Sequence, residues 1–404
     1  MNPAPPPASR RMAQVQAPII PVIADLIRNT PGTISLGQGV AYYGPPEAAL
    51  VAARQFGDKP EQHKYGPVHG IPELRERIER KLKAENGYGL EGRQVVVTAG
   101  ANMGFLNALF AIADPGDEVI LPLPYYFNQE MAIRMLSCVP VCVPTDQNHQ
   151  LDLTTLRAAI TPKTRAIVTM SPNNPSGAVY PDAALRAVNA LCREHGLYHI
   201  SDETYEYFVH GEARHFPPAT IEGSEAHTIA LYSLSKAYGF ASWRIGYMVI
   251  PEHLYDAVLK AQDTNLICAP LVSQHAAVAA LDVGAVYCRE HLRTIRVVRD
   301  IVLDELQAVA DLCQIPPAQG AFYILLKIDT PLDAMTLAER LIREHRVAAI
   351  PGNAFGLDEG CYLRIAYGAL QPDTAAAGIR RLTAGLKSIA GEQNTPSTTR
   401  TQHG

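Results

Sequence analysis

Short apolar runs alternate with amphipathic stretches over most of this 404-residue chain, and this alternation restricts the possible folds more than any other feature. A short continuous apolar run is typical of a strand that is covered on both faces. Seven such runs are expected to form strands: Gln94–Thr98, Glu118–Leu123, Val139–Val143, Arg165–Met170, Tyr198–Ser201, Ile229–Ser233 and Arg244–Ile250.

Between these runs lie segments with helical spacing of their apolar residues, namely Pro72–Glu85, Pro181–His195 and Pro251–Gln262. Each of them opens with proline, a residue that a helix start favours. Strands that alternate with helices in this way indicate an α/β domain with a mainly parallel sheet. We therefore predict a large domain with a seven-stranded, mainly parallel sheet over residues 46–285.

The pattern changes after about residue 285. Long helical segments are followed by apolar runs at Ala321–Lys327, Val347–Ile350 and Tyr362–Ile365, which predict a smaller α+β domain. We assign residues 286–391 to this domain, together with residues 15–45, whose helix near Val22–Arg28 is expected to join it. Residues 1–14 are rich in proline and residues 392–404 are polar, so both are predicted to be disordered tails.

Composition excludes several classes of function. Hydrophobic residues make up 47% and charged residues 19% of the chain, as in an ordinary globular protein, and the net charge is only -5. No Lys/Arg-rich run is present, so nucleic acid and anionic membranes are not expected partners. The longest apolar stretches are too short to span a bilayer, and the N-terminus has no apolar signal region. The seven scattered cysteines contain no C-x-x-C pair, which predicts a reduced, cytoplasmic protein.

Lys236 lies in Ser233-Leu-Ser-Lys-Ala-Tyr-Gly, between two predicted strands. A single lysine is usually a solvated surface charge. Here two serines precede it, and Arg244 is expected to begin the next strand. A lysine that forms imines must be neutral part of the time, and partial burial and nearby positive charge favour the neutral amine by lowering its pKa. These surroundings make Lys236 a candidate nucleophile.

Asp202 follows the predicted strand Tyr198–Ser201 in His199-Ile-Ser-Asp-Glu-Thr-Tyr. Open α/β sheets bind ligands at the carboxyl ends of their strands. A fixed carboxylate there can keep the ring nitrogen of a pyridine cofactor protonated, and Tyr205 can hydrogen-bond the phenolic oxygen of such a ring. The alternative is an aspartate that only caps the turn after the strand.

Two further loops follow predicted strands. In Ser171-Pro-Asn-Asn-Pro-Ser-Gly the prolines and the glycine predict a rigid turn that presents Asn174. In Thr98-Ala-Gly-Ala-Asn-Met-Gly a strand leads into a helix, whose exposed N–H groups are suited to a phosphate. This loop lacks the G-x-G-x-x-G pattern of a dinucleotide site, which excludes a Rossmann dehydrogenase.

Seven motifs in one order carry a resemblance to a known family. They are SLGQGV (Ser35–Val40), YGPVHGIPEL (Tyr65–Leu74), PNNPSG, SDETY, SLSKAYGFASWRIGY, PGNAFG (Pro351–Gly356) and LRIAYG (Leu363–Gly368). Over about residues 15–390 the chain resembles the fold-type I, class I/II aminotransferases that use pyridoxal 5′-phosphate. The resemblance implies two domains with the cofactor between them.

The resemblance also implies roles for particular residues. Lys236 would be the Schiff-base lysine and the acid/base that moves the substrate α-proton, and Asp202 would pair with the pyridinium. The other residues implied to hold the cofactor are Asn174 and Tyr205 at the phenolic oxygen, Tyr126 stacked on the ring, and Gly100, Ala101, Asn102, Ser233, Ser235 and Arg244 around the phosphate.

For the substrate, the resemblance implies that Arg364 binds the α-carboxylate, since a planar guanidinium can take it in a bidentate way. Gly39 would let the backbone approach the same carboxylate, and Asn174 would also contact the substrate. Tyr65 would reach the phosphate in the neighbouring subunit, so the resemblance predicts a homodimer with shared active sites.

The expected reaction is ping-pong transfer of an amino group from an amino acid to a 2-oxo acid. A β-lyase or a cyclising lyase remains the alternative, because the same fold hosts these reactions. A non-catalytic regulator is disfavoured, since the reactive positions are intact and no basic DNA-binding module is appended. No metal site is predicted: His195 and His199 are four residues apart, but Gly196 interrupts the helix that would align them.

The substrate prediction depends on the phosphate loop. Some prokaryotic aspartate aminotransferases of this family carry a lysine there that pairs with the distal carboxylate, and here Asn102 occupies that place. The stretches TAGANMGFLNAL, PYYFNQEMAIRM and DETYEYF are similar to plant aromatic/methionine aminotransferases. We therefore predict aromatic or methionine donors, with an aspartate or broad specificity as the alternative. The apolar wall for such side chains is expected from Tyr42, Tyr43, Tyr125, Tyr126 and Met103.

Overall fold

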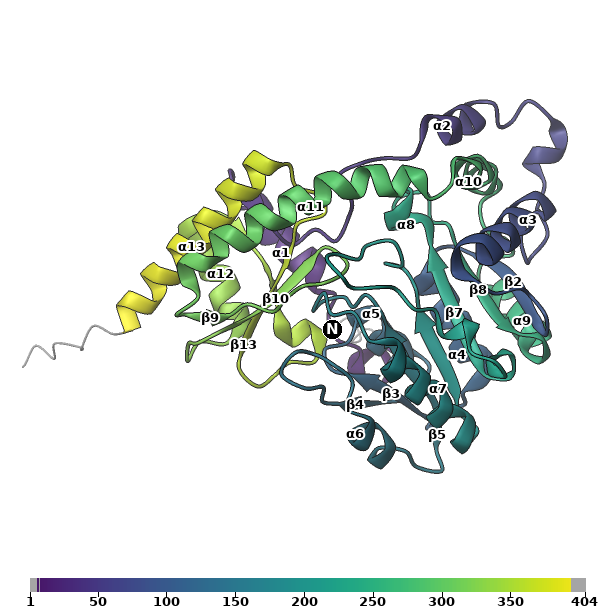
Figure 1. Ribbon diagram of the computed structural model, residues 1–404, viewed down its shortest axis with the longest axis horizontal. Coiled ribbons are helices and arrows are strands. Elements are labelled where there is room, and N and C mark those ends of the chain that lie inside the picture. Colours follow the sequence, from purple (N-terminus) through teal and green to yellow (C-terminus); the bar gives the residue numbers. More distant parts are fainter. Residues whose placement is uncertain (1–5, 7, 394–404) are drawn as a thin grey trace, which may run out of the picture.

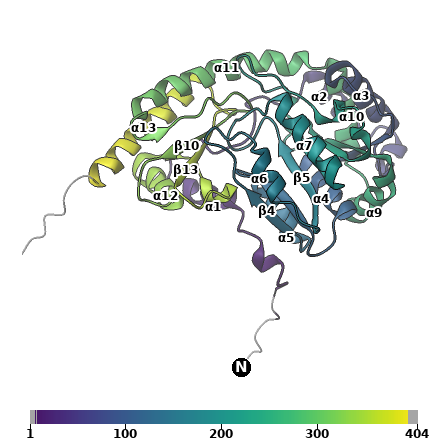
Figure 2. The same cartoon turned by 60° about the horizontal axis from the view of Figure 1, so that its bottom comes forward.

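The computed structural model describes residue 6 and residues 8–393. Two parts of unequal size lie side by side, each with its own sheet, and the long helix α11 (Val286–Leu306) runs from one to the other (Figures 1 and 2). The predicted fold class is confirmed: a large α/β domain with a seven-stranded, mostly parallel sheet and a smaller α+β domain.

The large sheet has the strand order β2-β8-β7-β6-β5-β3-β4. Strands β4, β3, β5, β6 and β7 run parallel, whereas β8 is antiparallel to both of its neighbours. The strands are β2 (Arg93–Thr98), β3 (Glu118–Pro122), β4 (Val139–Val143), β5 (Thr164–Met170), β6 (Tyr198–Asp202), β7 (Thr228–Ser233) and β8 (Gly246–Pro251).

Helices cover both faces of this sheet, which explains why the sequence shows continuous apolar runs and not an alternating pattern. On one face pack α4 (Ala101–Ile112), α5 (Phe127–Met135) and α9 (Tyr255–Asn265). On the other face lie α3 (Pro72–Lys81), α6 (Leu153–Ala158), α7 (Asp182–His195) and α10 (Leu271–Val283), with α2 (Glu47–Arg54) packed against α10.

All seven predicted strands are present, and one start requires correction. Arg244 was expected to open the last strand, but it lies in the preceding turn with a left-handed φ of 53°, and β8 begins at Gly246. The start of β8 is closely packed, because a Cβ at Gly246 would lie 2.5 Å from the carbonyl oxygen of Tyr232. The strand therefore opens on a glycine that fits against its neighbour.

The predicted helices differ from the structure mainly at their ends. Helix α3 continues into a π turn (Leu82–Asn86), which ends at the left-handed Gly87. Pro181 precedes the first residue of α7 in an extended conformation. Pro251 closes β8 and does not open a helix, because it pairs with Arg93; a 3-10 turn (Glu252–Leu254) then leads into α9.

The small domain is built around an antiparallel sheet with the order β12-β13-β10-β9. A second, two-stranded sheet pairs β1 (Ile34–Ser35) with β11 (Val347–Ala348), so the N-terminal segment joins this domain as expected. The remaining elements are α1 (Ile19–Arg28), β9 (Cys313–Gln314), β10 (Tyr323–Ile328), α12 (Ala334–His345), β12 (Ile350–Pro351), β13 (Cys361–Ala366) and α13 (Pro372–Gln393).

The domain bounds 15–45, 46–285 and 286–391 remain our proposal. Of the predicted tails, residues 1–5, 7 and 394–404 lie outside the described residues, while Met12–Gln14 forms one 3-10 turn and α13 runs to Gln393. Within residues 8–393, no single helix is both long and apolar enough to cross a membrane. Only α10 with the helical segment Val286–Val309, taken together, reach that length and composition, and they meet at an 80° bend.

Candidate active site

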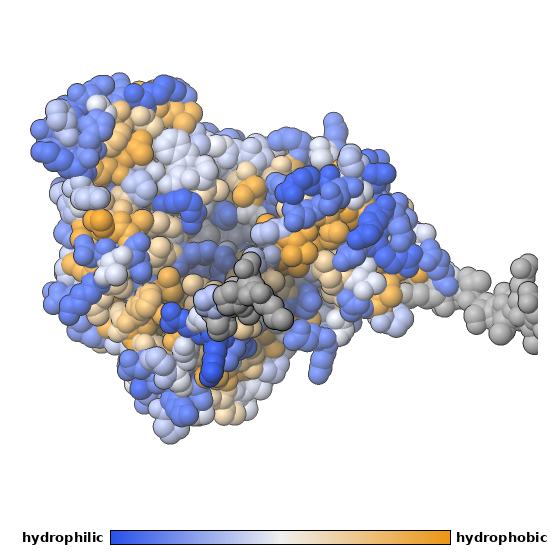
Figure 3. All heavy atoms as spheres, turned by 180° about the vertical axis from the view of Figure 1, so that it is seen from behind, coloured by the Kyte–Doolittle hydropathy of each residue, from blue (hydrophilic) through white to orange (hydrophobic). Residues whose placement is uncertain are grey.

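A cavity of about 520 Å³ lies between the two domains, a volume in the range of small-molecule sites. Figure 3 shows the surface hollowed between the two parts of the molecule. The large domain contributes the carboxyl ends of β5, β6 and β7 and the start of α4, and the small domain contributes α1, the loop 37–40, β10 and β13. Strand ends of this kind are where ligands bind in open α/β sheets.

Lys236 lies in α8 (Leu234–Ala237), a one-turn helix between β7 and β8, where a simple turn was predicted. Its Nζ donates a hydrogen bond of 2.5 Å to the carbonyl oxygen of Gly39. Burial, followed by the positive charges of Arg244 and Arg364, lowers the pKa of the Lys236 amine to about 8. A substantial fraction of this amine is therefore neutral near pH 8, as an imine-forming lysine requires.

Asp202 is the last residue of β6, and its carboxylate is buried. One oxygen accepts the backbone N–H of Thr204 at 3.1 Å, and the other accepts Nε2 of Gln129 at 3.0 Å. The first contact is the turn cap that the sequence offered as an alternative role, so the capping contact and a position in the cavity coexist. Burial raises the pKa of the Asp202 carboxyl to about 6, so a positive group beside it would be strongly favoured.

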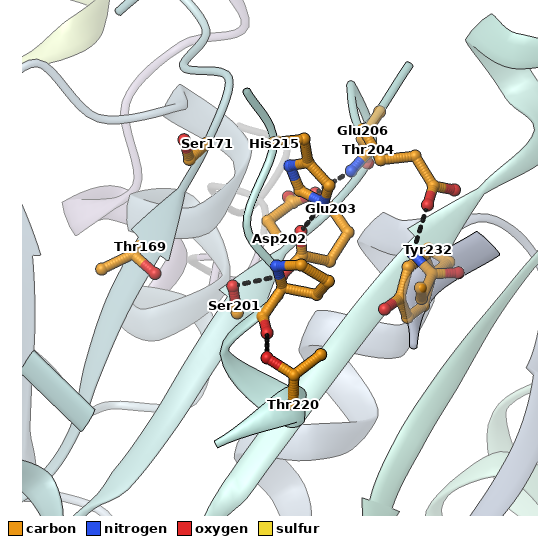
Figure 4. Close-up of polar contacts among 12 residues, drawn as sticks. Thr169, Ser171, Ser201, Asp202, Glu203, Thr204, Glu206, His215, Thr220 and Tyr232 are labelled. Carbon is orange, nitrogen blue, oxygen red and sulfur yellow. Dashed lines mark hydrogen bonds and ion pairs between the residues drawn. The ribbon is translucent and has the colours of Figure 1, made fainter. Parts of the chain in front are cut away.

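A second carboxylate lies directly behind the end of β6. Glu203 accepts a hydrogen bond of 2.5 Å from the Ser201 hydroxyl and forms an ion pair of 2.8 Å with the imidazole of His215. Figure 4 shows these side chains gathered around Asp202. The pair ties the strand end to the loop that carries His215, and so fixes the backbone at Asp202.

Arg364 lies on β13 and is 2% exposed. Its Nη1 donates to Oδ1 of Asn174 at 3.0 Å and its Nη2 donates to the carbonyl oxygen of Gly37 at 2.7 Å, whereas its buried Nε has no partner among the described residues. A buried N–H without an acceptor is rare in folded proteins. A carboxylate in the cavity would supply the missing acceptor.

A phosphate-sized concavity is formed where β2 leads into α4. Gly100 has a φ of 83°, which favours glycine, and a Cβ there would lie 2.4 Å from Nη2 of Arg244, so a side chain would displace this guanidinium. Nη1 of Arg244 also donates to Oγ of Ser235 at 3.4 Å. Ala101, Asn102, Ser233, Ser235 and Arg244 all line the same cavity. An N-terminal helix end beside a guanidinium and hydroxyl groups is suited to an anion.

The predicted apolar wall for the substrate side chain is largely wrong. Of the five residues proposed, only Tyr126 lines the cavity. Tyr43 lies behind Lys236, where its hydroxyl donates to the Lys236 carbonyl oxygen at 2.9 Å and its ring stacks on His291. The Tyr42 hydroxyl forms a hydrogen bond with His291, Tyr125 packs against Gly356, and Met103 is not among the residues that line the cavity.

The apolar wall comes instead from one face of α1. The lining side chains are Ile20, Ile23, Ala24 and Ile27 of α1, together with Val40, Phe127 and Ile350. The α1 residues among them recur three or four positions apart, as on one apolar face of a helix. This spacing could have identified the apolar face from the sequence. The sequence alone does not show the partner of that face, because the opposite wall of the cavity comes from the large domain.

Other predicted positions lie apart from the cavity. Tyr65 is 80% exposed on the large domain. His199 is buried between Thr169 and Asn189, at 2.8 and 3.1 Å, while His195 lies at the surface beside Arg157. Across residues 8–393, no group of three or more His, Cys, Asp or Glu side chains is arranged to hold a metal ion.

The fold and the site together define an enzyme with a lysine amine, a buried carboxylate and an anion cradle in one interdomain cavity. The sequence pattern of the family described as "Aminotransferase class I and II" matches residues 31–382. The chain therefore belongs to the class I and II aminotransferases and depends on pyridoxal phosphate, and the cavity provides the groups that this cofactor requires. It transfers an amino group between an amino acid and a 2-oxo acid.

Individual relatives agree with this assignment. An aromatic aminotransferase of Arabidopsis thaliana is 33% identical over 390 residues, which cover 94% of this chain and 96% of the relative. A probable aspartate/prephenate aminotransferase of Aquifex aeolicus is 35% identical over 88% of this chain and 91% of the relative. Among solved structures, the aspartate aminotransferase of Thermus thermophilus with maleate has a TM-score of 0.86 at 30% identity, covering 94% of this chain and 100% of that one.

Proposed function

We propose that the cavity residues hold the cofactor as the family resemblance implies. Arg244, Ser233, Ser235 and the backbone of Gly100, Ala101 and Asn102 bind the phosphate, Tyr126 covers the ring, and Asn174 and Tyr205 contact its phenolic oxygen. When bound, pyridoxal phosphate supplies an aldehyde that bonds covalently to the Lys236 amine and a ring that takes up electrons released at the substrate α-carbon.

Asp202 holds the ring nitrogen in its protonated form. Burial raises the pKa of its carboxyl to about 6, so a positive partner in contact would stabilise the ionised carboxylate. Gln129 and Thr204 orient both oxygens, so the carboxylate needs no rearrangement when the ring arrives.

Lys236 removes and returns the substrate α-proton. Its neutral amine is available because burial and two guanidinium groups lower the pKa of the amine, and the hydrogen bond to Gly39 orients Nζ toward the cavity. Arg364 and Asn174 bind the α-carboxylate and so orient the proton that Lys236 takes. Gly39 must be small here, because a Cβ would lie 2.7 Å from the Tyr323 hydroxyl oxygen.

We further propose that aromatic amino acids and methionine are the favoured donors. The observation that carries this proposal is the set of cations in the cavity lining: Lys236, Arg244 and Arg364. All three already have roles, so none of them remains for a second substrate carboxylate. The distal wall is the apolar face of α1, and a carboxylate placed there without a cation would cost on the order of a few kcal/mol.

The names of the relatives support two different preferences. Aromatic aminotransferases of Arabidopsis thaliana and Thermococcus litoralis favour the proposal by name, and aspartate/prephenate aminotransferases favour a broad specificity as the alternative. A panel of donors separates them. We expect kcat/KM for phenylalanine, tyrosine, tryptophan and methionine to exceed that for aspartate, and an aspartate value tenfold higher would overturn the proposal. Release of ammonia with pyruvate, without a new amino acid, would indicate a β-lyase.

We propose a homodimer whose partner subunit completes the site. The exposed Tyr65 supports this, since an 80% exposed aromatic ring is costly in an isolated chain and is suited to a contact between subunits. We also propose a reducing compartment, the cytoplasm, because all seven cysteines are free.

A further inference from the structure

Tyr323 lies at the start of β10 in the small domain and is 1% exposed. It lines the cavity, although no motif in the sequence marks it as a site residue. The guanidinium carbon of Arg364 lies 4.7 Å from the centre of its ring. Its hydroxyl oxygen is the atom that prevents a side chain at Gly39. Tyr323 therefore occupies the middle of the site without an assigned role.

The hydroxyl oxygens of Tyr205 and Tyr323 are 2.6 Å apart, which is a short hydrogen bond. Each hydroxyl has one proton to donate. Among the described residues, this is the one hydrogen bond formed by either hydroxyl. If Tyr205 donates to Tyr323, its proton is engaged there and is not available to a ligand. If Tyr323 donates, the Tyr205 proton is free to be donated to a ligand in the cavity.

The charges around the pair favour Tyr323 as the donor. The hydroxyl that lies closer to positive charge is the better proton donor. Burial raises the pKa of Tyr323 to about 12, and the adjacent Arg364 acts against this rise. Burial also raises the pKa of Tyr205, well above its usual value. Among the described residues, the Arg364 guanidinium lies over the ring of Tyr323, 4.7 Å from its centre, and not over that of Tyr205. Tyr323 therefore lies closer to positive charge and is the better proton donor.

We propose that Tyr323 is a positioning residue, which donates its proton to Tyr205 and thereby directs the Tyr205 proton into the cavity. There it meets the phenolic oxygen of the bound cofactor. The inference rests on the proposed contact of Tyr205 with that oxygen. Because Tyr323 belongs to the small domain and Tyr205 to the large one, the hydrogen bond also joins the two domains at the cofactor.

The test is a pH titration of the visible absorbance of the lysine-bound cofactor in the holoenzyme. Hydrogen bonds to the phenolic oxygen stabilise its negative charge, most strongly in the deprotonated chromophore, and so lower the midpoint of the titration. We expect Tyr205→Phe to raise the midpoint. Tyr323→Phe should raise it by a smaller amount, roughly half a pKa unit, as for one hydrogen bond that acts through another.

The chain offers a matched control. Tyr88 and Tyr232 form a second buried pair of tyrosine hydroxyls, 2.8 Å apart, and neither lines the cavity. Tyr88→Phe should fold and leave the midpoint unchanged. The double variant Tyr205→Phe/Tyr323→Phe should titrate like Tyr205→Phe alone, because Tyr323 acts only through Tyr205.

The outcomes separate this inference from the proposed function. A shift in Tyr205→Phe without any shift in Tyr323→Phe overturns the role of Tyr323 and leaves that of Tyr205. An equal Tyr323→Phe shift in the presence and absence of the Tyr205 hydroxyl overturns the transmission through Tyr205. If neither single variant shifts the midpoint, the contact of Tyr205 with the cofactor is overturned, and the inference with it.

Discussion

At the scale of single residues, the ionised carboxylate of Asp202 is unfavourable when no ligand is bound. Burial raises the pKa of its carboxyl from 3.8 to about 6. The unfolded chain releases this proton near pH 4, and the folded chain does so only near pH 6. The folded apoprotein therefore loses stability as the pH rises between these values, by about 3 kcal/mol in total.

This cost leads to a prediction for the apoprotein. Asp202→Asn should raise its free energy of unfolding at pH values well above 6, by up to about 3 kcal/mol, and the gain should disappear below about pH 4. Denaturant unfolding of both apoproteins at several pH values measures this difference. A variant that is less stable than the wild type at high pH would contradict the proposed buried charge.

The same substitution should have the opposite effect on catalysis. An amide cannot stabilise a protonated ring nitrogen, so we expect Asp202→Asn to bind the cofactor and to lose turnover by several orders of magnitude. Each pKa unit of lost ring protonation corresponds to about 1.4 kcal/mol. A steady-state kcat of Asp202→Asn within tenfold of the wild-type value would exclude the proposed role of Asp202.

Asn102 tests the basis of substrate preference. It lines the cavity beside Tyr126. Asn102→Lys would add a cation where the cavity has none to spare, so we expect kcat/KM for aspartate to rise relative to phenylalanine by about tenfold or more. If the ratio of kcat/KM for aspartate to that for phenylalanine does not change in the donor panel, the distal carboxylate is bound elsewhere.

Several of the residues that the sequence identified share one property: each comes directly after a predicted strand. Lys236, Asp202 and Asn174 could be placed in one cleft because parallel strands end at the same edge of a sheet. Gln129 and Tyr323 could not be found in this way. Their partners, Asp202 and Tyr205, are distant in the sequence, and no local pattern marks either contact.

At the scale of elements, α1 determines the shape of the substrate pocket. Ile23 lines the cavity, while Leu26 of the same helix packs in the same apolar cluster but outside the cavity. We expect Ile23→Ala to lower kcat/KM for phenylalanine by roughly tenfold and to change that for alanine little. Leu26→Ala should lower the free energy of unfolding without changing the ratio of kcat/KM for phenylalanine to that for alanine. An equal fall of this ratio in both variants would contradict the role of Ile23 in the substrate pocket.

The sequence predicted the elements themselves well. The strands of the large sheet were recognisable because burial on both faces leaves each as a continuous apolar run. The errors fall where long-range packing matters, as at Arg244, which lies in the turn before the closely packed Gly246 and not in the strand. The apolar wall was assigned to the wrong aromatic residues for the same reason, since Tyr43 packs behind Lys236.

At the scale of the whole molecule, the proposed dimer predicts complementation between inactive variants. In a mixed dimer of Lys236→Ala and Tyr65→Ala chains, one site contains both Lys236 and an intact Tyr65 from the other chain. We expect activity to return when the two variants are refolded together. Lys236→Ala mixed with Asp202→Asn is the control, because both residues serve the same chain's site and no intact site can form.

The central claim is that Lys236 alone binds the cofactor covalently. Holoenzyme reduced with sodium borohydride and digested should carry the reduced cofactor on the peptide that contains Lys236, as measured by mass spectrometry. Lys236→Ala should retain no trapped cofactor and almost no turnover, whereas substitution of the exposed Lys163 should change neither. Trapped cofactor and normal turnover in Lys236→Ala would contradict the account.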